Sequence, residues 1–206
     1  MKSLTNYIQE KLVIKKNKNG NSKNYKYFPE TKEELKAIII KRIKEEGNEV
    51  DLNDIDVSNI TDMSSLFYYQ ENFNGNISNW DVSNVKYMDN MFYRCYKFNK
   101  DISKWDVSKV TDMDCMFYGC TNFDQDISDW DVSSVTDMSS MFLSCETFNQ
   151  DISEWDVSNV TNMYSMFYEC KLFNQDISGW DVSNVTDMKR IFTYCPIEEK
   201  YKPKFK

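Results

Sequence analysis

The chain has 206 residues, of which 41% are hydrophobic and 28% are charged, a composition that excludes a largely disordered chain. The charges are unevenly distributed: residues 1–50 carry 12 Lys and Arg against 7 Asp and Glu, whereas residues 51–206 carry 13 against 26. A nucleic-acid-binding face needs clustered basic side chains, so the acidic body argues against a nucleic-acid partner.

The sequence contains no histidine. Histidine is the commonest general base, the usual partner of Ser and Cys nucleophiles and the commonest metal ligand. Its absence argues against an enzyme and against a metal site, and we expect no cofactor. The chain also has no run of 18 apolar residues, so no transmembrane segment is predicted.

Residues 1–26 form a basic N-terminal segment and linker. Residues 4–14 are weakly amphipathic, and residues 15–26, KKNKNGNSKNYK, are polar. The segment lacks the apolar run of a secretory signal, and the first cysteine is Cys95, so no lipid-attachment cysteine lies near the start. We expect a docking helix or a frayed end here, with a mobile tag that touches a membrane or a partner as the alternative.

Residues 27–50 are predicted to form a helical cap. Within them, residues 31–46 read TKEELKAIIIKRIKEE, with Thr31 and Glu34 at capping-box spacing and Gly47 where a helix ends. The apolar residues lie on one side of the predicted helix: Leu35, Ile38, Ile39 and Ile43. Because a repeat array needs a cover over its first unit, we expect this helix to supply it.

Residues 51–195 consist of six copies of a 25-residue repeat. The copies begin at Asp51, Asn76, Asp101, Asp126, Asp151 and Asp176, and positions within each copy are numbered from that residue. Apolar residues occupy positions 2, 5, 7, 10, 13, 16 and 17 of the copies; position 5 is Ile55 and then Trp, position 13 is Met and position 17 is Phe. A fixed period of this length indicates a stacked array.

Each copy combines two apolar periodicities. Positions 5 and 7 alternate with polar residues, as in a strand with one buried face. Positions 13, 16, 17 and 20 have the spacing of one stripe of a helix. The pattern predicts a strand, a turn, a short helix and a turn in each copy, with the apolar faces joined into one core by stacking.

The repeat also carries a family resemblance. The phrase WDVSNVTNM of residues 155–163 has near-twins at Trp80, Trp105, Trp130 and Trp180. This phrase, followed by x-x-M-F, resembles the 25-residue repeat of bacterial BspA-family surface proteins and lipoproteins. The buried pattern Ile152, Trp155, Val157 and Val160 resembles the strand phrase of leucine-rich repeats, and Met166, Phe167, Cys170 and Phe173 resemble its BspA-like branch.

Over residues 51–195 the resemblance implies a curved right-handed solenoid used for adhesion or protein binding, with no catalytic residues. The expected fold is therefore an α/β solenoid, a BspA-like leucine-rich-repeat superhelix of about six strand-turn-helix coils with an N-terminal helical cap.

Residues 196–206 form a C-terminal tail. Pro196 prevents a helix from continuing, and the segment that follows is IEEKYKPKFK. One alternative is that the tail folds back, with Ile197, Tyr201 and Phe205 on the apolar end of the last copy. The other is that this end pairs with another chain through an open strand edge. We favour fold-back and a monomer.

Five of the six cysteines occupy position 20 of successive copies: Cys95, Cys120, Cys145, Cys170 and Cys195. No C-x-x-C pair is present, so the sequence gives no support for a zinc site. We expect these cysteines to be small buried apolar residues.

A ladder of aspartates at position 6 is one candidate binding surface: Asp81, Asp106, Asp131, Asp156 and Asp181, with Asp56 in the first copy. Adjacent strands lie about 4.8 Å apart, so the carboxylates of neighbouring copies would repel one another. The favoured interpretation is that each accepts hydrogen bonds from the residue at position 8 of its own copy. A face for a basic partner and a row of Ca²⁺ ions are the alternatives.

A tyrosine stripe at position 18 is the other candidate: Tyr68, Tyr93, Tyr118 and Tyr168. Tyrosine is enriched at binding hot spots, although the same rings could pack sideways between neighbouring copies.

The function expected from the sequence is a non-catalytic module that recognises a protein or cell-surface ligand. The alternative is a structural or assembly component of a larger bacterial or phage particle. The resemblance implies the bacterial cell surface. The sequence shows no signal peptide or lipid-attachment cysteine, which leaves a cytoplasmic or particle-associated location as the alternative.

Overall fold

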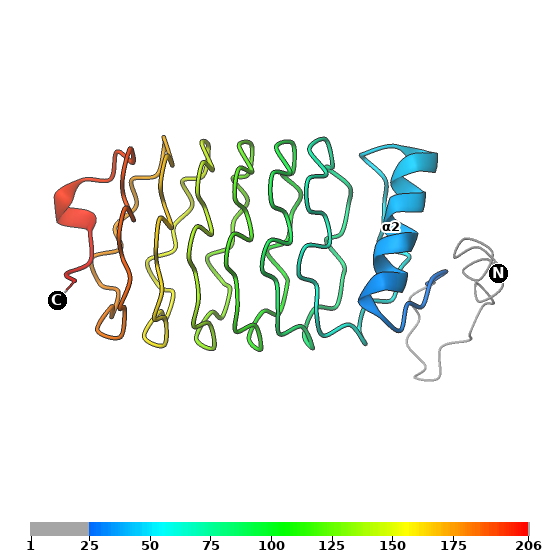
Figure 1. Cartoon of the computed structure of the whole chain (residues 1–206), viewed down its shortest axis with the longest axis horizontal. Coiled ribbons are helices and arrows are strands. Elements are labelled where there is room, and N and C mark those ends of the chain that lie inside the picture. The colour runs from blue at the N-terminus through cyan, green and yellow to red at the C-terminus, as the bar shows by residue number, and fades with distance from the viewer. Residues whose placement is uncertain (1–24, 206) are drawn as a thin grey trace.

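The computed structural model describes residues 25–205. Helix α2, Lys32–Glu46, lies at one end of a row of narrow coils, and the short 3₁₀ helix η1, Glu199–Tyr201, lies at the other end (Figure 1). Between them, successive copies of the repeat stand side by side, one coil for each copy. The basic segment of residues 1–24 lies outside the described residues.

Helix α2 begins and ends where the sequence predicts. The side chain of Thr31 accepts a hydrogen bond from the backbone N–H of Glu34, and Gly47 ends the helix with a φ of 91°, a conformation that favours glycine. Leu35, Ile38 and Ile39 are buried against the first coil. The helix therefore covers the apolar end of the stack.

Arg42 and Tyr27 fix this end of the stack further. Arg42 is buried, and its guanidinium binds the carboxylate of Asp54 at 2.8 Å and the carbonyl oxygen of Asp51 at 2.9 Å. Its Cζ also lies 5.2 Å from the centre of the Tyr27 ring. Tyr27 pairs in parallel with Ile55, so the chain before α2 extends the first coil along one edge.

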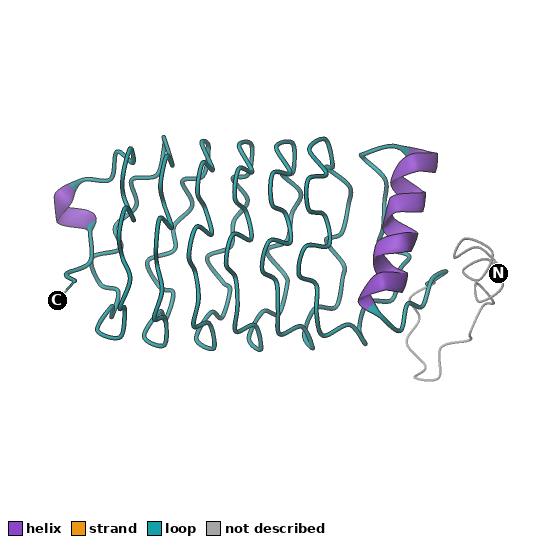
Figure 2. Cartoon of the chain, in the orientation of Figure 1, coloured by secondary structure: helices purple, strands orange, loops and turns teal. Residues whose placement is uncertain are grey.

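The copies differ in local structure from the predicted strand, turn, short helix and turn. Within residues 51–195 the structure contains turns and isolated parallel bridges, with no helix or strand (Figure 2). Two positions in each copy, 15 and 19, have a positive φ. The first copy has 57° at Ser65 and 59° at Tyr69, and the last has 60° at Arg190 and 58° at Tyr194. A right-handed helix cannot pass through left-handed residues, so the chain turns at each of them.

This turning backbone joins neighbouring coils by a one-directional ladder of hydrogen bonds. In the first five copies, the N–H groups at positions 13, 15, 17 and 19 donate to the carbonyls at positions 12, 14, 16 and 18 of the following copy, at 2.7–3.0 Å. The N–H groups between them, at positions 16, 18 and 20, donate to the carbonyl three residues earlier in their own copy. Along positions 15–20, therefore, successive backbone N–H groups alternate between a hydrogen bond to the following copy and a hydrogen bond within their own copy.

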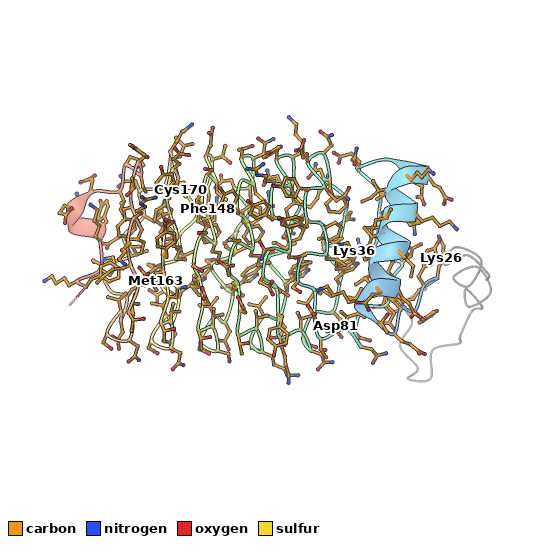
Figure 3. The ribbon with its side chains drawn as sticks, in the orientation of Figure 1. Lys26, Lys36, Asp81, Phe148, Met163 and Cys170 are labelled. Atoms are coloured by element: carbon orange, nitrogen blue, oxygen red, sulfur yellow. The ribbon has the colours of Figure 1, made fainter. Side chains whose placement is uncertain are left out.

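The core consists of stacked aromatic rings. Within one coil the phenylalanines at positions 17 and 23 stack 4.1–4.3 Å apart, for example Phe142 and Phe148. Between coils the position-17 rings follow one another at 5.3–5.9 Å. Phe148 and Met163 are fully buried and lie inside the stack (Figure 3). Each buried aromatic side chain contributes about 1.5–3 kcal/mol by leaving water.

Two polar contacts hold neighbouring coils in register inside this core. The indole Nε1 of each tryptophan donates to the position-2 carbonyl of the preceding coil, as Trp155 does to Ile127 at 3.1 Å. The thiol of Cys170 donates to the position-17 carbonyl of the preceding coil, that of Phe142, at 2.9 Å, and Cys95, Cys120 and Cys145 make the equivalent bond. Cys195, in the last copy, donates instead to the carbonyl of Phe173.

The ladder cysteines are free, and burial raises the pKa of thiols such as Cys145 above its usual range. The burial of Cys95, Cys120, Cys145 and Cys170 agrees with the prediction that these cysteines act as small apolar residues. Each of these thiols also donates a weak hydrogen bond to a backbone carbonyl.

The C-terminal tail folds back on the last coil, as the favoured alternative predicts. Ile197 is buried, and Tyr201 and Phe205 pack against the core. The N–H of Ile177 donates to the carbonyl of Tyr201 at 3.0 Å, so η1 takes the place of a next coil on this side.

Candidate functional site

The aspartate ladder has the local geometry that the favoured interpretation predicts. In Asp106, Oδ1 accepts hydrogen bonds from the backbone N–H of Ser108 at 3.1 Å and from its Oγ at 2.6 Å. An equivalent bond from the position-8 N–H reaches the Oδ1 atom of every other member: Asp56, Asp81, Asp131, Asp156 and Asp181. One carboxylate oxygen of each ladder member is therefore used to hold a turn.

These hydrogen bonds also favour the charged form of two ladder carboxylates. Hydrogen bonds from the hydroxyl and then the N–H of the neighbouring serine lower the pKa of Asp106 and of Asp156 below the usual range. Asp81 is exposed on the side of the stack, so the ladder presents a row of negative charge to solvent (Figure 3).

A second acidic row behaves differently. At position 12, Asp112 is partly buried and accepts a hydrogen bond from the backbone N–H of Asp114 at 2.9 Å. Burial, opposed by this hydrogen bond and aided by the charges of Asp89, Asp137 and Asp114, raises its pKa. Within residues 25–205 these carboxylates do not form a cluster of metal ligands. Position 12 is an aspartate in the first, third, fourth and sixth copies, so this row is interrupted where the position-6 ladder is continuous.

The structure divides the predicted tyrosine stripe. The rings of Tyr68, Tyr93 and Tyr118 stack in succession, with centres 4.9 Å and 4.4 Å apart. Tyr69 lies against the first of these rings, edge to face, at 4.6 Å. Tyr168 is separated from the group by Leu143 in the intervening copy, and it contacts Tyr194 at 5.5 Å instead.

Arg94 completes the group. Its guanidinium carbon lies 5.2 Å from the centre of the Tyr69 ring and 5.7 Å from that of Tyr93. We define the tyrosine patch as Tyr68, Tyr69, Tyr93, Tyr118 and Arg94. Tyr68 and Tyr69 are 42% and 44% exposed, which is high for side chains already in contact with other rings. Sequence reasoning missed Arg94, because position 19 varies freely between copies.

Gly119 lies beside Arg94 in the next coil. It occupies position 19 of the third copy with a φ of 71°, and a Cβ added there would lie 3.5 Å from Cγ of Arg94 and 3.6 Å from the ring of Tyr96. These are ordinary contact distances, so the left-handed backbone, and not a lack of space, favours glycine at this position.

The tyrosine patch is neutral apart from its guanidinium. Burial and the neighbouring Tyr118 raise the pKa of Tyr93 to about 12, although Arg94 opposes the change. The hydroxyl of Tyr93 therefore keeps its proton at neutral pH and can donate a hydrogen bond to a ligand. The surface combines aromatic rings, a hydrogen-bond donor and a guanidinium, which together suit non-covalent recognition.

Within residues 25–205 no helix has the length and apolar character needed to cross a membrane. This finding agrees with the sequence, which predicts no transmembrane segment.

Comparison with known proteins gives one family. The family model described as "Mycoplasma protein of unknown function, DUF285" matches residues 39–135 and again residues 103–202. The second match begins inside the first, as expected of a repeated sequence, and the two together span most of the chain. No curated protein and no solved structure matches. The chain therefore belongs to the DUF285 family, a repeat family that corresponds in general to the BspA-like repeats it resembles.

Proposed function

We propose that this chain is a non-catalytic binding module whose recognition surface is the tyrosine patch. In this proposal the six coils form a superhelix of the BspA-like leucine-rich-repeat type, and the ligand is a protein or another molecule on a cell surface. Support for a scaffold role comes from the inward positions, which are nearly identical in all copies, whereas the outward positions differ.

The observation that carries the proposal is the gathering of stacked tyrosines on the first three copies, with Tyr68 and Tyr69 exposed. Tyr68 and Tyr69 are exposed and Arg94 is partly exposed, and tyrosine and arginine are enriched among the residues that dominate binding energy at protein interfaces. The core does not need them there, because positions 18 and 19 of the fourth copy are Leu143 and Ser144 and the coils stack in the same way. Their rings are already held by mutual stacking, so binding would cost little side-chain entropy.

The aspartate ladder supports a second part of the same proposal. Five of its aspartates are exposed, and hydrogen bonds favour the charged form of Asp106 and Asp156, so the row favours the approach of a basic partner. Because charges of this kind mainly raise the association rate, we assign specificity to the tyrosine patch and long-range attraction to the aspartates.

A comparison of two double variants tests the proposal. Tyr68→Ser with Tyr69→Ser removes the exposed edge of the tyrosine patch, whereas Leu172→Ser with Tyr194→Ser removes two side chains that are 57% and 72% exposed elsewhere. Each protein is immobilised, exposed to intact cells or their surface extract, and the bound proteins are quantified by mass spectrometry. We expect the first variant alone to lose its ligand, by tenfold or more as hot-spot truncations of about 2 kcal/mol each allow.

Thermal melting of both variants shows whether they are as stably folded as the wild type. Equal retention of the same bound proteins by the wild type and the tyrosine-patch variant would contradict the proposal.

A further inference from the structure

The last coil has a row of unused hydrogen-bond donors. The N–H groups of Met188, Arg190, Phe192 and Tyr194 occupy positions 13, 15, 17 and 19, which cross to a following copy everywhere else in the array. Within the described residues 25–205 these four groups make no hydrogen bond. The folded-back tail pairs with Ile177 on the other half of the coil. Its Lys202 ammonium lies 5.7 Å from the centre of the Phe192 ring, but the tail accepts no hydrogen bond from these four donors.

The apolar residues beside these donors are also incompletely covered. Met163, Phe167 and Cys170 are fully buried in the fifth copy, whereas their equivalents Met188, Phe192 and Cys195 remain partly exposed. The open half of the last coil therefore combines unpaired donors with apolar surface. Unpaired backbone groups next to apolar surface favour a pairing partner.

The direction of the ladder determines which edge can pair there. Every carbonyl at positions 12, 14, 16 and 18 of the last copy accepts from the fifth copy, for example Lys189 from Ser165 at 3.0 Å. The open edge therefore offers these four donors without the matching acceptors, unlike an ordinary strand edge, in which the two alternate. A second copy docked tail to tail would place donors against donors, so the complementary partner must present a row of carbonyl acceptors.

The first coil of this same chain has such an acceptor row, but helix α2 covers it. The carbonyls of Asp62, Ser64, Leu66 and Tyr68 accept no hydrogen bond within the described residues. Lys32 contacts the side chains of Asp62 and Ser64. Lys36, labelled beside α2 in Figure 3, donates to the carbonyl of Ser65 at 3.1 Å. Because α2 also buries Leu35, Ile38 and Ile39, a second copy cannot reach this row without unfolding the cap.

Charge specifies the partner further. Positions 14 and 15 of the last copy are Lys189 and Arg190, both exposed, whereas none of the first five copies has a basic residue at either position. In the array, position-14 side chains of neighbouring copies meet: Oγ of Ser139 donates to Oδ1 of Asp114 at 2.6 Å. An added segment with an acidic residue at position 14 would therefore place its carboxylate beside Lys189.

We propose that the open edge of the last coil docks an acidic repeat segment of another protein chain, which pairs by accepting hydrogen bonds from Met188, Arg190, Phe192 and Tyr194. The partner continues the stack as a further coil: carbonyls at alternate residues take the four N–H groups, apolar side chains cover Met188 and Phe192, and carboxylates face Lys189 and Arg190. This docking surface lies on the last copy and is separate from the tyrosine patch on the first three.

A peptide with the properties of such a coil edge tests the proposal. The probe has the sequence of residues 110–119 with the change C115S, which carries aspartates at positions 12 and 14 of the repeat. The control peptide carries D112K and D114K in addition. Amide hydrogen exchange of the full chain is followed by NMR with each peptide. We expect the aspartate peptide alone to slow exchange at the four open N–H groups, by about tenfold at saturation.

A charge-reversed protein gives the second measurement. K189E with R190E changes two exposed side chains, and a negative residue is compatible with a positive φ, as Glu169 shows at 57°. We expect this variant to bind the aspartate peptide about tenfold more weakly and to prefer the lysine peptide, as the loss of two exposed ion pairs allows.

Three results would overturn the proposal: no binding of the aspartate peptide at millimolar concentration, protection of amides elsewhere than on the last coil, or an unchanged peptide preference after charge reversal.

Discussion

The indole Nε1 of Trp130 donates a hydrogen bond to the carbonyl oxygen of Ile102 in the preceding coil, over 3.2 Å. Both groups lie in the core, where no water can replace a lost partner. Each tryptophan thus packs within its own coil and also satisfies a buried carbonyl of its neighbour. The contact makes this residue type difficult to replace even by another aromatic residue.

Substitution of Trp130 should separate these two roles. Trp130→Ala creates a cavity and should lower the free energy of unfolding by about 3–5 kcal/mol. Trp130→Phe keeps most of the packing but leaves the Ile102 carbonyl unpaired, and it should cost about 1–3 kcal/mol. Urea unfolding followed by circular dichroism measures both. A loss below about 1 kcal/mol for the alanine variant would mean that the tryptophan column does not hold the coils together.

Two aspartates should respond to neutralisation with opposite signs. The pKa of Asp106 is lowered in the folded chain, so its carboxylate stabilises the fold above the usual carboxyl range and loses that contribution as the pH falls through the lowered pKa. The pKa of Asp112 is raised, so ionisation destabilises the fold at neutral pH, and this penalty disappears as the pH falls through the usual carboxyl range near 4.

At pH 7, Asp106→Asn should therefore lower the melting temperature, and Asp112→Asn should raise it by about 1–2 °C. The asparagine fits at position 12, because Asn162 occupies it in the fifth copy and donates to Asp137 at 3.0 Å. The Asp112→Asn effect should vanish below the usual carboxyl range, whereas the Asp106→Asn effect should persist there and decline only as the pH falls through the lowered pKa. If Asp112→Asn lowered the melting temperature at pH 7, the acidic row would not be under the electrostatic strain described above.

Calcium should have little effect on stability. The ladder carboxylates accept hydrogen bonds from their own turns, as Asp131 does from Ser133, and the described residues contain no group of metal ligands. Millimolar Ca²⁺ or a chelator should leave the melting temperature unchanged in differential scanning calorimetry. A shift above about 5 °C, equivalent to a kcal/mol or more for a chain of this size, would restore the calcium alternative.

Removal of the C-terminal tail should expose the end of the stack. Deletion of residues 197–206 removes Ile197, which is buried, and the carbonyl of Tyr201 that accepts from Ile177. We expect the shortened protein to self-associate in light scattering at concentrations where the full chain stays monomeric. Glu198→Gln, which changes one exposed residue of the same tail, is the control. A shortened protein that remains a stable monomer would show that the tail is not a cover.

The sequence predicted those features that depend on which side chains are buried. The columns of Trp, Met and Phe lie in the core, Asp106 bonds to Ser108, and Thr31 begins the helix that covers the first coil. These features follow from local chemistry or from apolar spacing, both of which can be read directly from the residues.

The conformation of positions 13–20 could not be predicted in this way. Apolar residues with helical spacing can also line one side of a chain that turns at two left-handed residues, so the pattern fits both conformations. A left-handed residue is usually recognised in a sequence because it is a glycine. Positions 15 and 19 hold residues such as Ser65, Arg94 and Glu169 instead, and the one glycine among them is Gly119. The cost of about 1–2 kcal/mol for such a residue is offset by hydrogen bonds to the next copy, which a single-copy pattern does not reveal.

The candidate site was partly predictable for a related reason. Position 18 identified Tyr68, Tyr93 and Tyr118, because the repeat itself aligns residues that lie side by side. Arg94 comes from a position without a consensus, and the Tyr69 ring that it contacts occupies the same variable position in the preceding copy. A contact between residues at a variable position cannot be predicted from the consensus sequence of the repeat.

The one-directional ladder makes each coil a unit with two unlike ends. A whole copy such as residues 101–125 has hydrogen-bond donors on one face and acceptors on the other. If one copy were lost or duplicated, the donor face of each copy would still meet the acceptor face of the next. A gene for such an array can therefore lengthen or shorten in steps of 75 nucleotides by unequal recombination, without the evolution of a new interface. Reversal of one coil is forbidden by the same hydrogen bonds, so the distance between helix α2 and the far end of the molecule changes only in whole coils.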